Sequence, residues 1–201
     1  MINPTTITNY NRTEAELEEF LLFAILVAGK TAKTQAKKLD SFLFQSGLCK
    51  MTPFEAIEHL LKLGESRYYT IGNNPLVICM KGHKLGQYKR LYNAFKGILD
   101  FKGKLKTISV AELESVNGIG SKTARFFILH SRKDAKVACL DVHILKWMRE
   151  QGYSAPKQTP TKKRYAILEK QFLTEAWKRE MNPADLDLMI WKSFSQKVLA
   201  Q

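Results

Sequence analysis

Residues 114–127 have the sequence ESVNGIGSKTARFF. In this segment two glycines flank one aliphatic residue, and a lysine follows shortly after. Apolar residues at helical spacing stand on both sides of the glycines, which predicts a short helix ending at Val116, a tight turn and a second helix. Gly118 and Gly120 permit positive φ and carry no Cβ that would hold a ligand away. Ile119 between them is predicted to point inward and anchor the turn.

The start of the second predicted helix, near Ser121, is a candidate anion site. Backbone amides at a helix N-terminus are unpaired and point outward with the positive end of the helix dipole, so they can bind a phosphate without any side chain. Such a contact would read the DNA backbone and not its sequence. A turn with two glycines between helices is usually only a turn, so both interpretations stay open for Asn117 to Gly120 on the motif alone.

Lys122 and Asp141 are the candidate catalytic residues. Lys122 lies in the first turn of its predicted helix, where the dipole disfavours an ammonium; this would leave more of a catalytic lysine as the neutral, nucleophilic amine. Asp141 follows 19 residues later in LDVHIL, before another predicted helix, so one helix and a returning loop can place it beside Lys122. Aspartate is also a preferred N-cap, and both roles stay open for Asp141.

The composition favours a globular protein with a polyanionic partner. The 201 residues are 45% hydrophobic, enough for one sizeable core or two small lobes. Lysine and arginine number 32 against 19 acidic residues, which gives a formal net charge of +13. That charge favours nucleic acid through counterion release, with an anionic membrane surface or a merely basic surface as alternatives.

The cysteines and the chain ends indicate an intracellular protein. Cys49, Cys79 and Cys139 lie far apart with no CxxC pair, which argues against a disulfide framework or a zinc site; we expect buried small side chains in a reducing compartment. No run reaches the roughly 18 apolar residues of a membrane span, and the N-terminus lacks the order of a signal peptide. We expect the cytoplasm or nucleoid of a prokaryote, or the nucleus of a eukaryote.

Helix start and stop signals recur along the chain. Thr13 with Glu16, and Thr52 with Glu55, have the spacing of capping boxes. The helical period predicts helices over residues 13–29, 31–47, 52–64, 87–101, 109–116, 121–132, 141–150, 161–180 and 183–200. Residues 65–86 are predicted to be mostly a connector, in which only LVICM could form a strand. The sequence therefore predicts an all-α protein.

The glycine turn VNGIGSKTA, followed by LDVHIL 19 residues after its lysine, resembles the helix-hairpin-helix DNA glycosylases, the superfamily of endonuclease III and the 8-oxoguanine DNA glycosylases. The central match covers about residues 109–150, and the N-terminal LLFAILVAGKTAKTQAKKL resembles the early helix pair of the superfamily. The resemblance implies two helical lobes with a DNA-binding cleft between them. It places one lobe at residues 30–130, ending in the hairpin motif 109–131, and the other at 1–29 plus 131–201.

The resemblance also implies roles for the candidate residues. Lys122 would attack C1′ of the damaged nucleotide, expel the base and form a Schiff base, after which β-elimination can nick the strand. Asp141 would assist departure of the base. Asn117, Gly118, Ile119 and Gly120 would grip phosphates of damaged double-stranded DNA, and backbone carbonyls of 116–120 would hold a monovalent cation.

The sequence differs from the superfamily pattern at the turn, at the residue that fills the gap left by the flipped base, and in its cysteines. Asn117 replaces the common proline before the first hairpin glycine. Lys30 stands where endonuclease III-like members have the glutamine that fills the gap left by the flipped base. No C-terminal run of four cysteines is present, so we expect no iron–sulfur cluster and no other cofactor. LDVHILKW and LDLMIWKSF look most like the compact 8-oxoguanine glycosylases of prokaryotic or archaeal type.

Several basic residues are further candidates for DNA contact. Lys30, with Lys33, Lys37 and Lys38, shares one face of a predicted helix, which is either solvated or in contact with the DNA backbone. Arg125 lies one turn after Lys122 and is the stronger candidate for a phosphate contact.

Three aromatic side chains, His143, Trp191 and Phe194, are candidates for the base pocket. His143 is interpreted as structural in preference to a proton-transfer group. Trp177, Trp191 and Phe194 are expected to pack in the core, although the resemblance implies that Trp191 or Phe194 stacks on the flipped purine.

Two classes of function compete on the sequence. The leading prediction is a monomeric base-excision enzyme, a DNA glycosylase with AP lyase activity on 8-oxoguanine. An endonuclease III-like enzyme for oxidised pyrimidines and a non-catalytic DNA-binding module are the alternatives. Only an enzyme needs Lys122 and Asp141 together.

Overall fold

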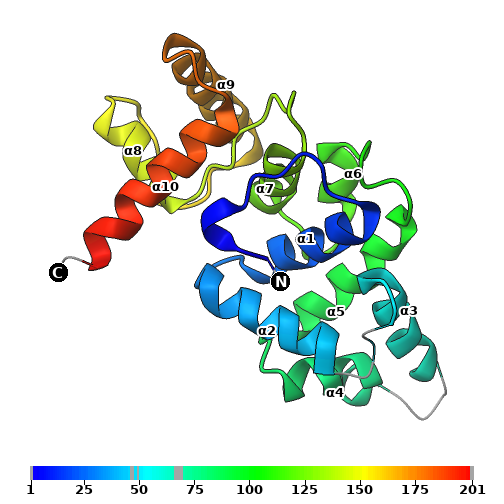
Figure 1. Ribbon diagram of the computed structural model, residues 1–201. Coiled ribbons are helices and arrows are strands. Elements are labelled where there is room, and N and C mark those ends of the chain that lie inside the picture. The colour runs from blue at the N-terminus through cyan, green and yellow to red at the C-terminus, as the bar shows by residue number, and fades with distance from the viewer. Residues whose placement is uncertain (1, 46–47, 49, 66–69, 200–201) are drawn as a thin grey trace. The chain divides into compact units, whose positions relative to one another are not determined.

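The computed structural model describes residues 2–45, 48, 50–65 and 70–199, and within them every regular element is a helix (Figure 1). The α-helices are α1 (Glu14–Leu26), α2 (Ala32–Gln45), α3 (Pro53–Leu63), α4 (Pro75–Gly82), α5 (Tyr88–Gly97), α6 (Val110–Ser115), α7 (Ser121–Ser131), α8 (Val142–Glu150), α9 (Lys162–Lys178) and α10 (Pro183–Leu199). Short 3₁₀ helices are η1 (Pro4–Thr6), η2 (Ile71–Asn73) and η3 (Ile98–Phe101). The predicted all-α class is confirmed.

Capping side chains set the starts of α1 and α3 where the sequence predicted them. The Thr13 hydroxyl accepts from the backbone N–H of Glu16, and the Glu16 carboxylate accepts from the N–H of Thr13, which closes a capping box. Thr52 and Glu55 repeat the arrangement. The predicted stop of α2 at Gly47 lies outside the described residues.

The prediction for residues 65–86 is wrong over 75–82, which form α4. Asn74 accepts a hydrogen bond from the N–H of Leu76 and caps the helix, and Pro75 occupies its first position. Leu76, Val77 and Met80 are buried and pack on one side. A run of eight residues is too short for periodicity to separate a buried helix from a strand, and the Asn-Pro pair was the signal that decides it.

The chain divides into two units, which we describe separately. Unit 1 comprises residues 1–7 and 11–120, and unit 2 comprises 8–10 and 121–201. The expected lobes were 30–130 and 1–29 plus 131–201. Helix α1 was expected in the second of these lobes but belongs to unit 1, and α7 was expected in the first but belongs to unit 2. α1 packs against α2, α3 and α5, and α7 packs against α10.

In unit 1 the central element is α1, which is buried from Leu17 to Leu26 on almost every side. Even Glu18 is covered, and its carboxylate accepts from the N–H of Phe54 at 3.0 Å, at the start of α3. A helix that is apolar on all faces needs neighbours all around it. Helices α2, α3 and α5 supply them.

In unit 2 the core lies among α8, α9 and α10. Its buried side chains are Ala138, Leu140, Ile144, Leu145, Met148, Ala155, Tyr165, Leu168, Phe172, Ala176, Leu186, Ile190 and Phe194. The segment 138–140, just before α8, is part of this core, so the start of α8 is held by packing as well as by its cap.

Candidate active site

The glycine turn joins α6 to α7 and is closed by one backbone hydrogen bond. The N–H of Ile119 donates to the carbonyl of Val116 at 3.0 Å. Both side chains are buried, as expected for an inward anchor, while Asn117 and Gly120 are exposed. The turn therefore presents its polar edge to solvent and its apolar residues to the core of unit 1.

The two glycines differ in what the fold requires of them. Gly118 has φ +100°, and a Cβ there would lie 2.8 Å from the carbonyl oxygen of Arg90. Gly120 has no positive φ, and a Cβ there would meet nothing within 4 Å. Of the two glycines that permit positive φ, only Gly118 adopts it.

Arg90, in α5, ties the turn to the rest of unit 1. Its Nη1 donates to the carbonyl of Gly118 and its Nη2 to that of Ile25, both at 2.9 Å. Its Nε donates to the Gln87 side chain at 2.7 Å, and burial lowers the pKa of the guanidinium. No sequence pattern indicates this role, since Arg90 is one of 32 basic residues and lies outside the turn.

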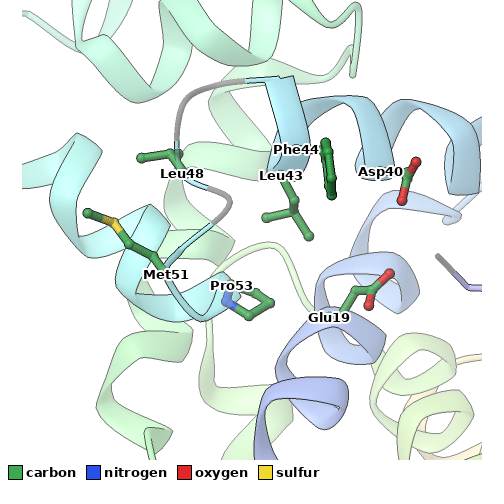
Figure 2. Close-up of a pocket in the computed structure, with 7 residues that line it drawn as sticks. All are labelled: Glu19, Asp40, Leu43, Phe44, Leu48, Met51 and Pro53. Atoms are coloured by element: carbon green, nitrogen blue, oxygen red, sulfur yellow. The ribbon is translucent and has the colours of Figure 1, made fainter.

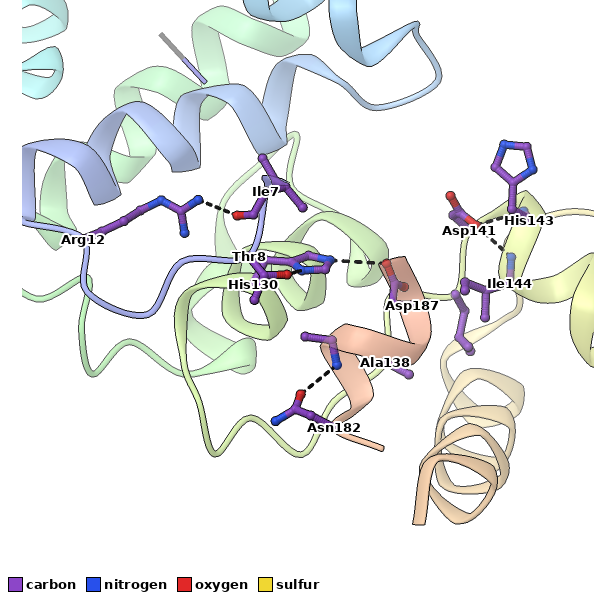
Figure 3. A network of polar contacts seen from close by, with 12 residues as sticks. Ile7, Thr8, Arg12, His130, Ala138, Asp141, His143, Ile144, Asn182 and Asp187 are labelled. Atoms are coloured by element: carbon purple, nitrogen blue, oxygen red, sulfur yellow. Dashed lines mark hydrogen bonds and ion pairs between the residues drawn. The ribbon is translucent and has the colours of Figure 1, made fainter. Parts of the chain in front are cut away.

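Lys122 and Asp141 each lie at a helix start in unit 2, and both are half-buried. Lys122 is the second residue of α7. Asp141 is the N-cap of α8, and its Oδ1 accepts from the N–H groups of His143 and Ile144 at 2.8 and 2.9 Å (Figure 3). The cap predicted for Asp141 is therefore present, and it fixes the direction of the carboxylate.

The two candidate catalytic charges act on the same buried groups. Burial raises the pKa of the Cys139 thiol well above its usual value, Asp187 and Asp141 raise it further, and Lys122 lowers it. Burial also raises the pKa of Asp187; among its charged neighbours Asp141 raises it, whereas His130 and Lys122 lower it. Lys122 and Asp141 thus both affect one buried cluster, and their direct neighbourhood stays a prediction.

A chain of polar contacts passes through His130 beside this cluster (Figure 3). The Nδ1 of His130 lies 2.8 Å from the hydroxyl of Thr8, and its Nε2 lies 3.3 Å from Asp187 Oδ2. Asp187 is buried, and its Oδ1 has no hydrogen-bond partner. Asp187 and His130 were not singled out from the sequence, since a histidine and an aspartate 57 positions apart in two helices form no motif.

Two of the predicted DNA-contacting side chains are occupied inside their own units. Arg125 donates from Nε to Glu169 Oε1 at 2.8 Å, and its guanidinium lies 4.6 Å from the centre of the Tyr165 ring. Lys30 donates to the carbonyl of Leu85 at 2.6 Å. Burial, then Arg90 and Lys38, lower the Lys30 pKa. Both side chains therefore have contacts that hold the fold, and their contact with phosphate stays a prediction.

The candidate base-pocket residues separate into one partly exposed and two packed side chains. Trp191 is half-buried on α10. Phe194 is buried and stacks on His143, with ring centres 5.5 Å apart and planes 20° apart. Trp177, expected in the core, is instead 79% exposed on α9.

A hollow of about 160 Å³ elsewhere in unit 1 contains none of the predicted site residues (Figure 2). It is lined by Glu19, Asp40, Leu43, Phe44, Leu48, Met51 and Pro53. Among the described residues, no three His, Cys, Asp or Glu side chains gather as metal ligands. Over the same residues, no helix is long and apolar enough to cross a membrane.

Of the three cysteines, Cys139 is buried as expected and Cys79 is half-buried, both without a disulfide, while Cys49 lies outside the described residues.

The all-α fold and the glycine turn agree with the resemblance to the helix-hairpin-helix DNA glycosylases. Residues 4–181 match the family of 8-oxoguanine DNA glycosylases with this fold, and the chain belongs to that family. The predicted family and enzyme class are confirmed.

Solved structures show a similar fold. An 8-oxoguanine glycosylase/lyase from Methanocaldococcus jannaschii, in complex with a 15-mer DNA containing 8-oxoguanine, is similar with a TM-score of 0.62 and 19% identity over 90% of this chain and 81% of that chain. A second structure of the 8-oxoguanine DNA glycosylase from that organism has 22% identity, with 90% and 78% covered and a TM-score of 0.62. The 8-oxoguanine DNA glycosylase of Thermotoga maritima has 22% identity, with 89% and 79% covered and a TM-score of 0.59.

Proposed function

We propose that this protein removes 8-oxoguanine from double-stranded DNA and then cleaves the resulting abasic site, with Lys122 as nucleophile and Asp141 as its catalytic partner. The observation that supports this most directly is the pair itself. Both residues begin helices of unit 2, both are half-buried, and both charges act on Cys139 and Asp187. A protein that only binds DNA through the hairpin has no use for this pair.

In the proposed first step, the lone pair of the neutral Lys122 amine forms a bond to C1′ of the damaged nucleotide. The bond between C1′ and the base breaks, its electrons leave with the base, and the base takes up a proton. Loss of the amine proton and opening of the sugar ring give the imine. Removal of a C2′ proton then breaks the C3′–O bond and nicks the strand.

Asp141 is proposed to stabilise the positive charge that develops on the sugar. Its Oδ1 accepts two hydrogen bonds from backbone N–H groups at the start of α8. These donors belong to the helix backbone, so they hold the carboxylate in a fixed direction. A fixed carboxylate in a partly dry site stabilises a developing cation more than water does. The N-cap and the catalytic role are thus compatible, since the same bonds that cap α8 also orient the charge.

The exposed edge of the turn, Asn117 and Gly120, is proposed to bind backbone phosphates with the amides that begin α7. Open space at Gly120 supports this, because internal packing gives no reason for a glycine there. The monovalent cation implied by the superfamily does not fit at Gly118, whose carbonyl already accepts from the Arg90 guanidinium. We therefore derive no step through a cation.

Trp191 is proposed to stack on the flipped base, because Phe194 already stacks on His143. The chain's three cysteines are too few for a four-cysteine cluster. We propose that the reaction uses no cofactor and that the protein acts as a monomer. We also propose that it works in the compartment of the cell that contains the genome.

The test is covalent trapping with borohydride, which reduces an imine to a stable amine. Duplexes with 8-oxoguanine, thymine glycol or an abasic site are incubated with the wild type, Lys122→Gln and Asp141→Asn. We expect an adduct on 8-oxoguanine that is lost in Lys122→Gln and strongly reduced in Asp141→Asn. An adduct on thymine glycol alone would contradict the substrate, and binding with no adduct on any lesion would contradict the reaction.

A further inference from the structure

The chain between Lys122 and Asp141 does not by itself fix the distance between their side chains. α7 ends at Ser131, and the residues from there to Asp141 contain no regular helix. A lysine side chain is also flexible along its whole length. Something outside this segment must therefore hold the start of α7 in register with the start of α8.

Glu169 of α9 contacts both α7 and the segment that leads to α8. Its Oε1 accepts from Arg125 Nε at 2.8 Å and from the backbone N–H of Ala138 at 2.9 Å. Arg125 lies about one turn after Lys122 on α7, and Ala138 lies three residues before Asp141. One carboxylate oxygen thus joins the helix of the nucleophile to the segment that leads to the catalytic carboxylate.

Further contacts tighten each side of this bridge. Arg125 Nη1 donates to the carbonyl of Ser121, the residue before Lys122, at 3.4 Å. The hydroxyl of Tyr165, one turn before Glu169 on α9, donates to the carbonyl of Ala138 at 2.8 Å and accepts from the N–H of Leu140 at 2.9 Å. Two consecutive turns of α9 therefore fix the residues immediately before Asp141.

Stability alone does not account for this arrangement. The Arg125 and Glu169 side chains are only 15% and 14% exposed, so both charges lose most of their hydration. The attraction in such a pair roughly balances that loss, and an apolar pair of similar volume is often as stable. What an apolar pair cannot reproduce is the shared oxygen, which sets a distance between two elements. Small misplacements of reacting groups reduce rates strongly.

We propose that Glu169 is a positioning residue of the active site, which holds Lys122 in register with Asp141 through its shared contact with Arg125 and Ala138. This inference rests on the proposed function, because it assigns a purpose to a contact between the elements that contain the two catalytic residues. Arg125, predicted from the sequence to contact phosphate, is then the partner through which Glu169 acts.

The test separates chemistry from binding and from folding. Glu169→Met, which removes the shared oxygen, the double variant with Arg125→Met and Glu169→Met, and Tyr165→Phe are compared with the wild type. Glu150→Gln, at an exposed position of α8, removes the same charge as a control. For each protein we measure the single-turnover rate of adduct formation at saturating 8-oxoguanine duplex, the Kd for a duplex with a non-reactive abasic analogue, and the Tm.

We expect Glu169→Met to lower the single-turnover rate about tenfold and to leave the Kd within about twofold. Its Tm should fall, because Arg125 keeps its charge without a counterion. In the double variant the Tm should recover while the rate stays low, because no buried charge is unpaired but the bridge is still missing. Tyr165→Phe should also lower the rate, and Glu150→Gln should match the wild type in all three measurements.

Three results would overturn the inference: a wild-type rate in Glu169→Met, recovery of the rate together with the Tm in the double variant, or a loss confined to the Kd. These differ from failure of the proposed function, in which the wild type itself forms no adduct and Glu169 loses the role assigned here.

Discussion

His130 Nε2 lies 3.3 Å from Asp187 Oδ2, and this contact between α7 and α10 is covered from solvent. The opposite ring nitrogen contacts the Thr8 hydroxyl, and the His130 carbonyl accepts from the N–H of Asn9 at 3.1 Å. One histidine therefore holds residues 8–10 on unit 2 through both its ring and its backbone. This explains why these three residues belong to unit 2 although their neighbours in the chain belong to unit 1.

The buried Asp187 should make the stability of the protein depend on pH. Burial first, then Asp141, raises its pKa above the ordinary value of about 4. The folded state therefore binds this proton more tightly than the unfolded state, and stability falls as pH rises from about 4 through the raised folded pKa. We expect Asp187→Asn, which cannot ionise, to gain stability relative to the wild type as pH rises. Urea unfolding of both proteins at a series of pH values measures the difference.

The control for Asp187 is Asp185→Asn, an exposed aspartate two residues earlier on α10. Its difference from the wild type should not grow as pH rises. A constant difference between Asp187→Asn and the wild type over pH 4 to 8 would show that Asp187 is not neutralised by folding.

Arg90→Lys should weaken DNA binding although it keeps the positive charge. A lysine has one nitrogen in place of the three that bind Gln87, Gly118 and Ile25, so it does not reproduce the fixed fork that attaches the turn to α1. We expect the Kd to rise about tenfold, equivalent to about 1.4 kcal/mol, with an unchanged slope of log Kd against log salt. Fluorescence anisotropy with labelled duplex over a range of salt concentrations measures both.

Arg90→Met and Lys96→Met complete that comparison. Lys96 is exposed near the end of the same helix and serves as the charge control. If Arg90 contacted a phosphate directly, Arg90→Met would reduce the salt slope by about 0.9. That outcome, with Arg90→Lys close to the wild type, would contradict the positioning role.

The two hairpin glycines should respond differently to alanine. Gly118→Ala imposes a positive φ on a residue with a Cβ and brings that atom to 2.8 Å from the Arg90 carbonyl, so we expect a loss of about 1–3 kcal/mol of stability. Gly120→Ala should change stability by no more than about 0.5 kcal/mol, yet weaken DNA binding, because the added Cβ would stand where a phosphate approaches. Denaturant unfolding and anisotropy separate the two effects. Full affinity in Gly120→Ala would remove Gly120 from the proposed phosphate site.

Trp177 and Trp191 form a matched pair for the base pocket. Trp177→Ser should leave stability within about 0.5 kcal/mol of the wild type and excision unchanged, because the side chain is 79% exposed on α9. Trp191→Ala should lower the excision rate about tenfold, since stacking of a base on an aromatic ring contributes about 1–3 kcal/mol. Single-turnover release of 8-oxoguanine measures both. Equal rates in the two variants would contradict stacking on Trp191.

Local signals in the sequence predicted most of the helices and indicated the candidate catalytic residues. Thr13, Thr52 and Asp141 cap helices where the sequence placed them, because a cap and its amides lie within three residues of each other. The same reasoning missed α4, where a short apolar run carries little periodicity. It also did not show that Arg125 and Lys30 have internal partners, because charge is visible in a sequence whereas a tertiary contact is not.

Spacing along the chain was enough to predict the all-α class, the glycine turn and the candidate pair Lys122 and Asp141. The residues that contact the turn and the two helices of this pair are visible only in the tertiary structure. Arg90 reaches Gly118 across 28 positions, Glu169 reaches Arg125 and Ala138 across 44 and 31, and His130 reaches Asp187 across 57. Contacts between distant residues arise when helices pack, and packing depends on the shape of every buried side chain together. No local pattern records that shape, so the support of the site became visible only in the folded chain.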